Sequence, residues 1–198
     1  MKSHIIGIDE VGRGALAGPV VVAAALVAGS VRFPRALGKL RDSKKLSPKQ
    51  REAWFAHFAD RPEISFAVAR VYPRGVERMN ISRAANMAAG KAYRRLVIAT
   101  GARTTAVFLD GGLFIGNAAQ PRHARTVVKG DETIKAVAIA SIIAKVTRDR
   151  YMVRLARRHP AYGLDVHKGY GTTAHRAAIR KHGPTPVHRA TFLKGAIS

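Results

Sequence analysis

The chain has 198 residues, 47% of them hydrophobic, so residues 1–198 are enough to bury a sizeable core as one domain. Its 35 Lys and Arg against 12 Asp and Glu give a formal charge of +23, which favours a polyanionic partner, most simply nucleic acid, over a merely soluble basic protein. The sequence has no cysteine, no apolar run of 18 residues and no signal-peptide layout, which excludes disulfides, thiolate zinc sites and a membrane span and predicts a cytoplasmic protein.

The first expected element is a short strand formed by the apolar run Ile5–Ile8. It leads directly into two adjacent carboxylates, Asp9 and Glu10, and then into a Gly12-Arg13-Gly14 turn. Side chains alternate between the two faces of a strand, so these two acids converge only if the strand frays or bulges. A solvated loop with a surface ion pair to Arg13 stays open as the alternative.

A second strand is expected at Pro19–Val27, an unbroken apolar segment that begins with β-branched residues and follows turn residues. Ser47 followed by Pro48 is typical of an N-cap and a first helical position, which predicts a helix from Pro48 to about Phe58. Ser43, Lys44 and Lys45 lie in the loop before that helix, where they could hold a phosphate or be ordinary solvated residues.

The middle of the chain predicts a strand, a helical turn and a long helix. Residues Ile64–Val71 alternate well enough for a strand, and Arg74–Met79 indicates a short helical turn. Asn80 to Ser82 caps a helix that is expected to reach about Ala99. Its apolar stripe at three- and four-residue spacing is assigned to the core and consists of Ala85, Ala88, Ala89, Ala92 and Leu96.

Two further strands are expected to end in acids. Thr104–Leu109 leads into Asp110-Gly111, and Thr126–Val128 leads through Lys129-Gly130 into Asp131. Active groups gather at strand ends in twisted sheets, although Asp-Gly is also an ordinary turn. Helical spacing then runs from Thr133 to about Arg158, with Asp131 or Thr133 as its N-cap.

The C-terminal part places an aromatic residue between glycines. Tyr170 lies in the run His167-Lys168-Gly169-Tyr170-Gly171, and a basic helix is expected over Thr173–Lys181. An exposed aromatic ring flanked by Lys and His is suited to stacking on a sugar or a base. A packed, half-buried ring is an equally good interpretation of Tyr170 from these residues alone.

The four acids at strand ends suggest a metal site. If Asp9, Glu10, Asp110 and Asp131 meet at one edge of the sheet, their charges repel unless cations neutralise them. Ligation by oxygen alone suits Mg²⁺ or Mn²⁺. Two such ions about 4 Å apart activate water and stabilise the leaving oxygen in phosphodiester cleavage.

Seven blocks of sequence follow one another along the chain: Gly7-Ile8-Asp9-Glu10-Val11-Gly12-Arg13-Gly14, Ala17-Gly18-Pro19-Val20, Asp42-Ser43-Lys44, Leu109-Asp110-Gly111, Lys129-Gly130-Asp131, Ala140 to Arg150, and His167-Lys168-Gly169-Tyr170. In this order, and covering the chain from about residue 4 to residue 193, they resemble the signature series of the bacterial ribonuclease HII family. Some are weak individually, but together they are highly specific.

The resemblance implies an α/β protein with an RNase H-like fold, a mixed central sheet flanked by helices. It implies a core over about residues 1–158 and a C-terminal helical portion over about 159–198 that closes over the substrate. The implied activity is cleavage of RNA in RNA/DNA hybrids, and of ribonucleotide-containing duplex DNA on the 5′ side of the ribonucleotide, leaving 3′-hydroxyl and 5′-phosphate ends. A monomer is expected.

By motif, the resemblance assigns metal binding to Asp9, Glu10, Asp110 and Asp131. It assigns contacts to the 2′-hydroxyl and the neighbouring phosphate to Gly12, Arg13 and Gly14, mainly through the backbone. It also assigns to Tyr170 stacking on the deoxyribose that follows the ribonucleotide. The 2′-hydroxyl is the group that distinguishes RNA from DNA at a site, so a backbone sensor and a stacking ring are sufficient to recognise an RNA-to-DNA junction.

The sequence departs from the family pattern after Asp131, where Glu132 adds an acid beside the expected metal site. Asp149 is a rival fourth acid, but its place between arginines in a helix favours a structural ion pair. Two alternatives remain at this stage: a ribonuclease HIII-like nuclease, and a non-catalytic basic nucleic-acid-binding protein. The second gives no reason for acids at three strand ends.

Overall fold

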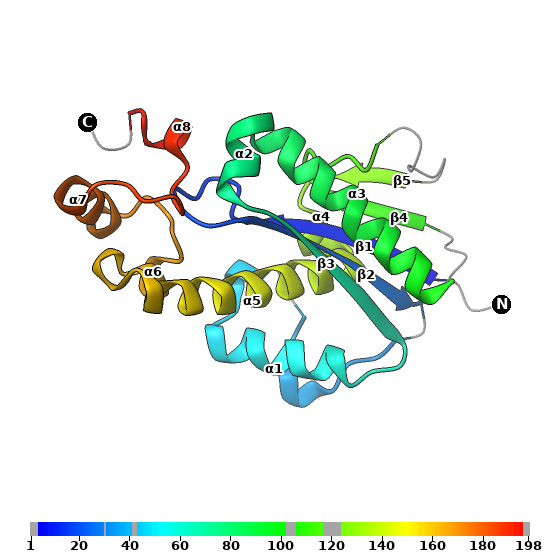
Figure 1. The fold of residues 1–198 in the computed structure, drawn as a ribbon. Helices are drawn as coiled ribbons and strands as arrows, with labels where there is room; N and C mark the ends of the chain where they lie inside the picture. The colour runs from blue at the N-terminus through cyan, green and yellow to red at the C-terminus, as the bar shows by residue number, and fades with distance from the viewer. Residues whose placement is uncertain (1–3, 30, 41–42, 102–105, 117–123, 196–198) are drawn as a thin grey trace.

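A computed structural model of the chain describes residues 4–29, 31–40, 43–101, 106–116 and 124–195. Its five strands form one sheet in the order β3-β2-β1-β4-β5 (Figure 1). The strands β1 (His4–Val11), β2 (Val20–Ala28) and β3 (Ile64–Val71) are antiparallel neighbours. The strands β4 (Ala106–Asp110) and β5 (Ala124–Val127) extend the sheet parallel to β1. The expected mixed α/β sheet is thereby confirmed.

The central strand β1 is longer than its apolar run. It pairs with β2 without interruption as far as Val11, so the strand neither frays nor bulges at Asp9 and Glu10, and the expectation that it ends at Ile8 is wrong. Its pairing with β4 stops at Ile8, opposite Leu109. The two acids therefore lie on a part of β1 whose second edge is open, and Asp110 lies at the end of β4 beside it.

One face of the sheet is covered by α3 (Ile81–Thr100), which follows the short helix α2 (Pro73–Met79). Asn80 caps α3, because its side-chain oxygen accepts a hydrogen bond of 3.0 Å from the N–H of Arg83. The predicted alanine stripe is buried against Ile6 and Ile8 of β1, which confirms both the helix and its apolar face.

The other face is covered by α5 (Lys135–Arg158) and α1 (Pro48–Ala59). The predicted cap of α1 is confirmed: the hydroxyl of Ser47 accepts from the N–H of Gln50 at 3.2 Å, and the Gln50 side chain accepts from the N–H of Ser47 at 2.8 Å. Gly7 allows α5 to lie directly on β1, since a Cβ at this position would stand 2.1 Å from the carbonyl carbon of Ala136.

The long helix does not begin where the periodicity indicates. Residues Gly130–Thr133 form a separate turn, α4, and the extended backbone of Ile134 divides it from α5. Asp131 therefore lies in the first turn of α4 rather than at a strand end. Neither Asp131 nor Thr133 is the N-cap of α5, because that position belongs to Ile134.

The C-terminal portion extends beyond one end of the sheet (Figure 1). It contains a 3₁₀ turn at Pro160–Tyr162, then α6 (Leu164–His167), α7 (Thr173–His182) and α8 (Ala190–Leu193), with its own small apolar cluster. Two more 3₁₀ turns, at Arg35–Leu37 and Ser43–Lys45, precede α1. None of the helices in the described part of the chain is long and apolar enough to cross a membrane.

Candidate active site

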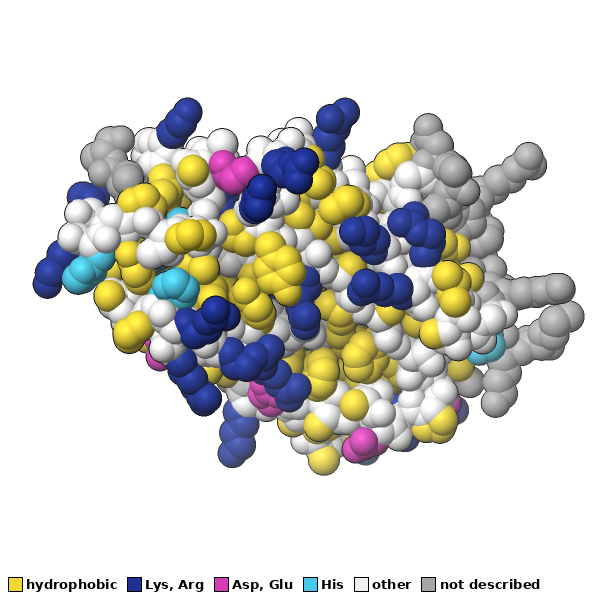
Figure 2. Space-filling model, in the orientation of Figure 1, with side chains coloured by type: hydrophobic (Ala, Val, Ile, Leu, Met, Phe, Trp, Pro, Cys, Tyr) yellow, Lys and Arg dark blue, Asp and Glu magenta, His cyan; other side chains and the backbone are white. Residues whose placement is uncertain are grey.

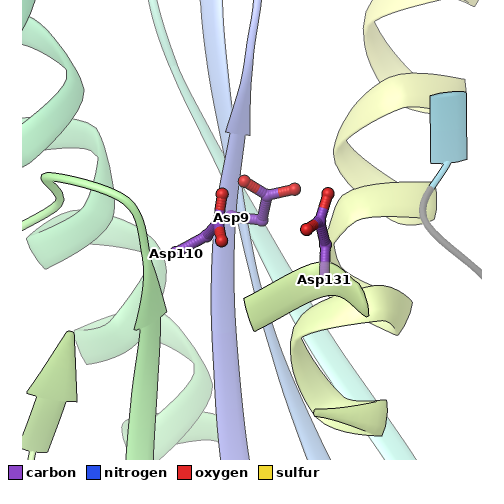
Figure 3. Close-up of side chains that lie close together, drawn as sticks. All are labelled: Asp9, Asp110 and Asp131. Atoms are coloured by element: carbon purple, nitrogen blue, oxygen red, sulfur yellow. The ribbon is translucent and has the colours of Figure 1, made fainter. Parts of the chain in front are cut away.

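Three aspartates meet at the open edge of β1. Asp9 comes from β1, Asp110 from the end of β4 and Asp131 from α4, and their side chains point toward one another (Figure 3). One carboxylate oxygen from each lies within 4.8 Å of the others. Asp9 and Asp131 are buried, with exposed fractions of 6% and 5%. Residues separated by about a hundred positions are thus brought together by the parallel pairing of β1 with β4.

Asp9 is held by hydrogen bonds although its charge is costly. Burial, followed by the charges of Glu10 and Asp110, raises the pKa of Asp9 well above its ordinary value. Hydrogen bonds from Ser141 and from the N–H of Glu10 act in the opposite direction. The hydroxyl of Ser141 also lies 2.8 Å from that of Ser43. Since each hydroxyl carries one proton, Ser43 donates to Ser141 when Ser141 donates to Asp9.

Glu10 points to the opposite face of the sheet and is not part of the group of three. One of its carboxylate oxygens accepts from the Arg13 guanidinium at 3.1 Å, whereas the other, Oε2, is buried and has no hydrogen-bond partner among the described residues. Burial raises the pKa of Glu10, and the charge of Asp110 adds to this effect. Strand alternation therefore separates the two adjacent acids, as expected for a strand without a bulge, but the charge of Asp110 acts on the pKa of both.

The donor set fits a hard divalent cation. Three carboxylates clustered this closely, two of them buried, provide oxygen ligands of the kind that Mg²⁺ and Mn²⁺ take. A cation at the acids would offset the repulsion from Glu10 and Asp110 that adds to burial in raising the pKa of Asp9. The residues present therefore fit such an ion.

The loop before α1 lies against α4. Lys44 Nζ is 3.8 Å from a carboxylate oxygen of Asp131, and Lys45 Nζ is 3.0 Å from one of Glu132. Both lysine side chains remain more than half exposed, whereas Ser43 is buried. Ser43 is thus not presented to a phosphate, contrary to its expected role. Glu132 pairs with Lys45 and lies outside the group of three aspartates.

Two buried arginines that the sequence analysis missed support the Gly12-Arg13-Gly14 loop. Arg148 donates to the carbonyls of Ala17, Pro19 and Lys168, and Arg189 donates to those of Arg13 and Gly18, all at 2.8–3.1 Å. Both side chains are fully buried. Gly12, with φ of +87°, leaves the space that the Arg148 guanidinium occupies, since a Cβ there would stand 2.2 Å from Nε.

Tyr170 lies on the same arginine and borders a basic cleft. The Arg148 guanidinium carbon is 5.2 Å from the centre of the Tyr170 ring. The ring also lines a cleft of about 630 Å³ between α1, α5 and α6, together with Arg51, Lys145, Arg150, Arg154 and Lys168. Figure 2 shows Lys and Arg gathered over this part of the surface, and the acids Glu52 and Asp149 also line the cleft. Asp149 pairs with Lys145 at 2.9 Å, so its predicted structural ion pair is confirmed.

The five-stranded sheet with its clustered acids belongs to the RNase H-like class of nucleases. Two similar solved structures support this assignment. The ribonuclease HII in a complex with PCNA from Archaeoglobus fulgidus is 26% identical and superimposes with a TM-score of 0.73, covering 94% of this chain and 93% of that one. Bst-RNase HIII in complex with Mn²⁺ also gives a TM-score of 0.73, covering 99% of this chain and 70% of that one. The second likeness, at 23% identity, concerns the fold alone.

The particular family follows from the sequence match. The model of the ribonuclease HII family matches residues 6–194, and the chain belongs to that family. The ribonuclease HII of Granulibacter bethesdensis is 44% identical over 191 residues, which are 95% of this chain and 83% of that protein. The chain is therefore a metal-dependent endoribonuclease of the ribonuclease H type, which confirms the expected enzyme class and removes the non-catalytic binding protein.

Proposed function

We propose that this ribonuclease cuts RNA in RNA/DNA hybrids and cuts duplex DNA on the 5′ side of an embedded ribonucleotide, leaving 3′-hydroxyl and 5′-phosphate ends. The observation that carries the proposal is the convergence of Asp9, Asp110 and Asp131, of which Asp9 is hydrogen-bonded by Ser141, one turn before the cleft residue Lys145 on α5. Residues 159–198 contribute Tyr170 to the basic cleft between α1, α5 and α6, and we further propose that the enzyme acts as a monomer. We place this activity in the cytoplasm, as the sequence predicts.

Asp9, Asp110 and Asp131 would hold Mg²⁺ or Mn²⁺, with Glu10 contributing its unpartnered oxygen from the other face of β1. Bound in pairs, these ions supply activation of the attacking water and stabilisation of the leaving oxygen. Ser141 orients the Asp9 carboxylate, and Ser43 orients Ser141. Ser43 thus acts on the site through Asp9 rather than through the substrate.

The remaining groups bind and read the substrate. Lys44 and Lys45 stand beside the acids with exposed ammonium groups and are suited to the phosphates that flank the cut. Gly12, Arg13 and Gly14 form a loop whose carbonyl side is fixed by Arg189, leaving its open side for the 2′-hydroxyl. Tyr170, at the cleft, would stack on the deoxyribose after the ribonucleotide.

The test is cleavage of an end-labelled DNA duplex that carries one ribonucleotide, with Mg²⁺, with Mn²⁺ and with a chelator, and with the cut mapped. We expect a metal-dependent cut 5′ to the ribonucleotide and none on the all-DNA duplex. A cut within the RNA of a uniform hybrid, but none at the single ribonucleotide, would overturn the junction activity and retain only the hybrid nuclease.

A further inference from the structure

Three histidines of the C-terminal portion form one connected cluster. The rings of His167 and His175 are stacked with centres 4.2 Å apart, and Nε2 of His175 lies 3.2 Å from Nε2 of His188. His175 and His188 are buried, with exposed fractions of 0% and 5%. The three histidines come from α6, α7 and the segment before α8, so the cluster joins the elements of the C-terminal portion.

The main-chain groups at the ends of the cluster fix the tautomer of every ring. The N–H of Thr185 donates to Nδ1 of His188 at 3.0 Å, so the proton of His188 is on Nε2. That proton is donated to Nε2 of His175, which places the proton of His175 on Nδ1. Nδ1 of His175 then donates to the carbonyl of Tyr170 at 3.0 Å. A single direction of donation thus runs from Thr185 to Tyr170.

His167 holds the other side of the same residue. Its Nδ1 accepts from the N–H of Gly169 at 3.2 Å, so Nε2 carries the proton and donates to the carbonyl of Tyr162 at 2.8 Å. The main-chain carbonyl of His167 accepts from the N–H of Tyr170 at 3.0 Å. The peptide groups before and after Tyr170 are therefore both bound to this cluster.

The neutral form of the cluster is the stable one. Burial lowers the pKa of His175 to about 4, and burial also lowers the pKa of His167 and of His188. A second proton on His175 would point at the N–H of His188. The titratable and charged groups around the three rings are His159, Tyr162, Asp165, Lys168, Tyr170, His182 and Arg189.

Tyr170 lies between two glycines, Gly169 and Gly171, whose backbone has little conformational preference of its own. Gly169 has φ of +80° and approaches the carbonyl of Ala17 so closely that a Cβ would stand 2.5 Å away, and Gly171 follows on the other side. Two glycines leave the backbone at Tyr170 with little stiffness of its own. The direction of the ring then depends on the donors to its peptide groups, which also include the N–H of Thr172 on the Tyr170 carbonyl at 2.8 Å, and on the Arg148 guanidinium against the ring.

We propose that His175 is a positioning residue, which, together with His188, holds the Tyr170 carbonyl and so directs the Tyr170 ring into the cleft where an RNA-to-DNA junction is recognised. This inference rests on the proposed stacking role of Tyr170. It assigns to the histidines selectivity for the junction, not the cleavage step, because none of them lies among the acids.

Two substitutions of His175 separate the two ring nitrogens. The amide nitrogen of Asn lies near the position of Nδ1. His175→Asn therefore keeps a donor for the Tyr170 carbonyl and loses the hydrogen bond with His188. The amide group of Gln reaches the position of Nε2. His175→Gln therefore keeps the contact with His188 and loses the hydrogen bond to the Tyr170 carbonyl. The readout is the ratio of cleavage at a single embedded ribonucleotide to cleavage of a uniform hybrid, since damage to the metal site lowers both equally.

We expect His175→Gln to lower that ratio about tenfold, the effect of losing one hydrogen bond of about 1.4 kcal/mol, whereas His175→Asn stays within about threefold of the parent. In a Tyr170→Ala background, His175→Gln should have no further effect on the ratio. His182→Gln removes an exposed histidine of the same portion and is the control, with no change expected.

The outcomes distinguish the stacking role of Tyr170 from the positioning role of His175. If Tyr170→Ala leaves the ratio unchanged, the stacking role fails and this inference fails with it. If Tyr170→Ala lowers the ratio but the Gln and Asn variants behave alike, only the role of His175 is overturned. Should His175→Gln not fold, as judged by circular dichroism, His188→Asn replaces it: it keeps the acceptor for Thr185, frees the tautomer of His175 and should lower the ratio about threefold.

Discussion

Two regions of the molecule each bring charges of one sign together. The edge of the sheet holds Asp9, Asp110 and Asp131, and the space beneath the loop that follows β1 holds Arg148 and Arg189. The arginine donors end on main-chain carbonyls, so the fold itself completes that site. The aspartates face one another, and completing their site requires a cation from outside. Buried charges of one sign thus stabilise the fold where main-chain groups bind them, as at the arginines. They form a functional site where a cation from outside is required, as at the aspartates.

The largest effect is expected from removing one charge at the acidic edge. Asp110→Asn should lower cleavage about 1000-fold or more, because the metal ions lose a ligand on which the reaction depends. Substrate binding should persist or tighten, since the exchange removes repulsion of the phosphates. Single-turnover cleavage and a binding titration measure the two effects, with the exposed Asp60→Asn as the matched control. Undiminished cleavage would refute the assignment of the metal site.

The buried arginines should respond through stability instead. Arg189→Met should lower the free energy of unfolding by about 3 kcal/mol, because the carbonyls of Arg13 and Gly18 lose charged donors in a buried place. Urea denaturation of the metal-free protein measures the loss, and Arg180→Met, at an exposed position in α7, should change it little. Equal losses for the two variants would mean that the buried network contributes nothing specific.

The helix α5 connects the two regions, since it carries both Ser141 and Arg148, and Gly7 sets its distance from β1. Gly7→Ala should cost about 2 kcal/mol of stability, because the new methyl group meets the backbone of Ala136. It should also weaken Mg²⁺ binding by moving Ser141 away from Asp9. Gly112→Ala, which has open space around the new Cβ, is the control. Calorimetry of Mg²⁺ binding that is unchanged in the Gly7 variant would disprove the link.

The smallest effect concerns pH in the presence of a chelator. The pKa values of Asp9 and Glu10 are raised in the folded state above 3.8 and 4.5, so each group favours folding most at low pH and loses that contribution as pH rises through its raised value. The metal-free protein should therefore lose stability from about pH 4 upward, and Asp9→Asn should flatten the slope. Denaturation at a series of pH values shows whether the slope has this sign.

Local patterns predicted most elements because local rules govern them. Ser47 with Pro48 and Asn80 fixed the starts of α1 and α3, and the alanine stripe of α3 faces the core as its spacing indicated. The long apolar run of β2 is buried along its whole length. The prediction missed the short helices α4, α6 and α8 and some element ends, as at β1 and at Ile134, where sheet pairing and packing decide.

The site was only partly predictable for the same reason. Acids followed by glycine indicated where Asp9 and Asp110 meet, but whether Glu10 joins them depends on the face of β1 that meets α5. Arg148 and Arg189 gave no sign in the sequence, because a buried and an exposed arginine look alike in a basic chain. Gly12 and Gly169, which make room for neighbouring groups, were the available signal, and they were interpreted as turn and flank residues.

The strand β2 has a consequence for refolding. Its nine residues, VVVAAALVA, are uncharged, rich in β-branched side chains and fully buried in the native sheet. In an unfolded chain such a segment can pair with copies of itself and start aggregation. The net charge of +23 keeps chains apart only while salt is low, because the Debye length shrinks to about 10 Å at 0.1 M. Refolding yield should therefore fall as salt is added.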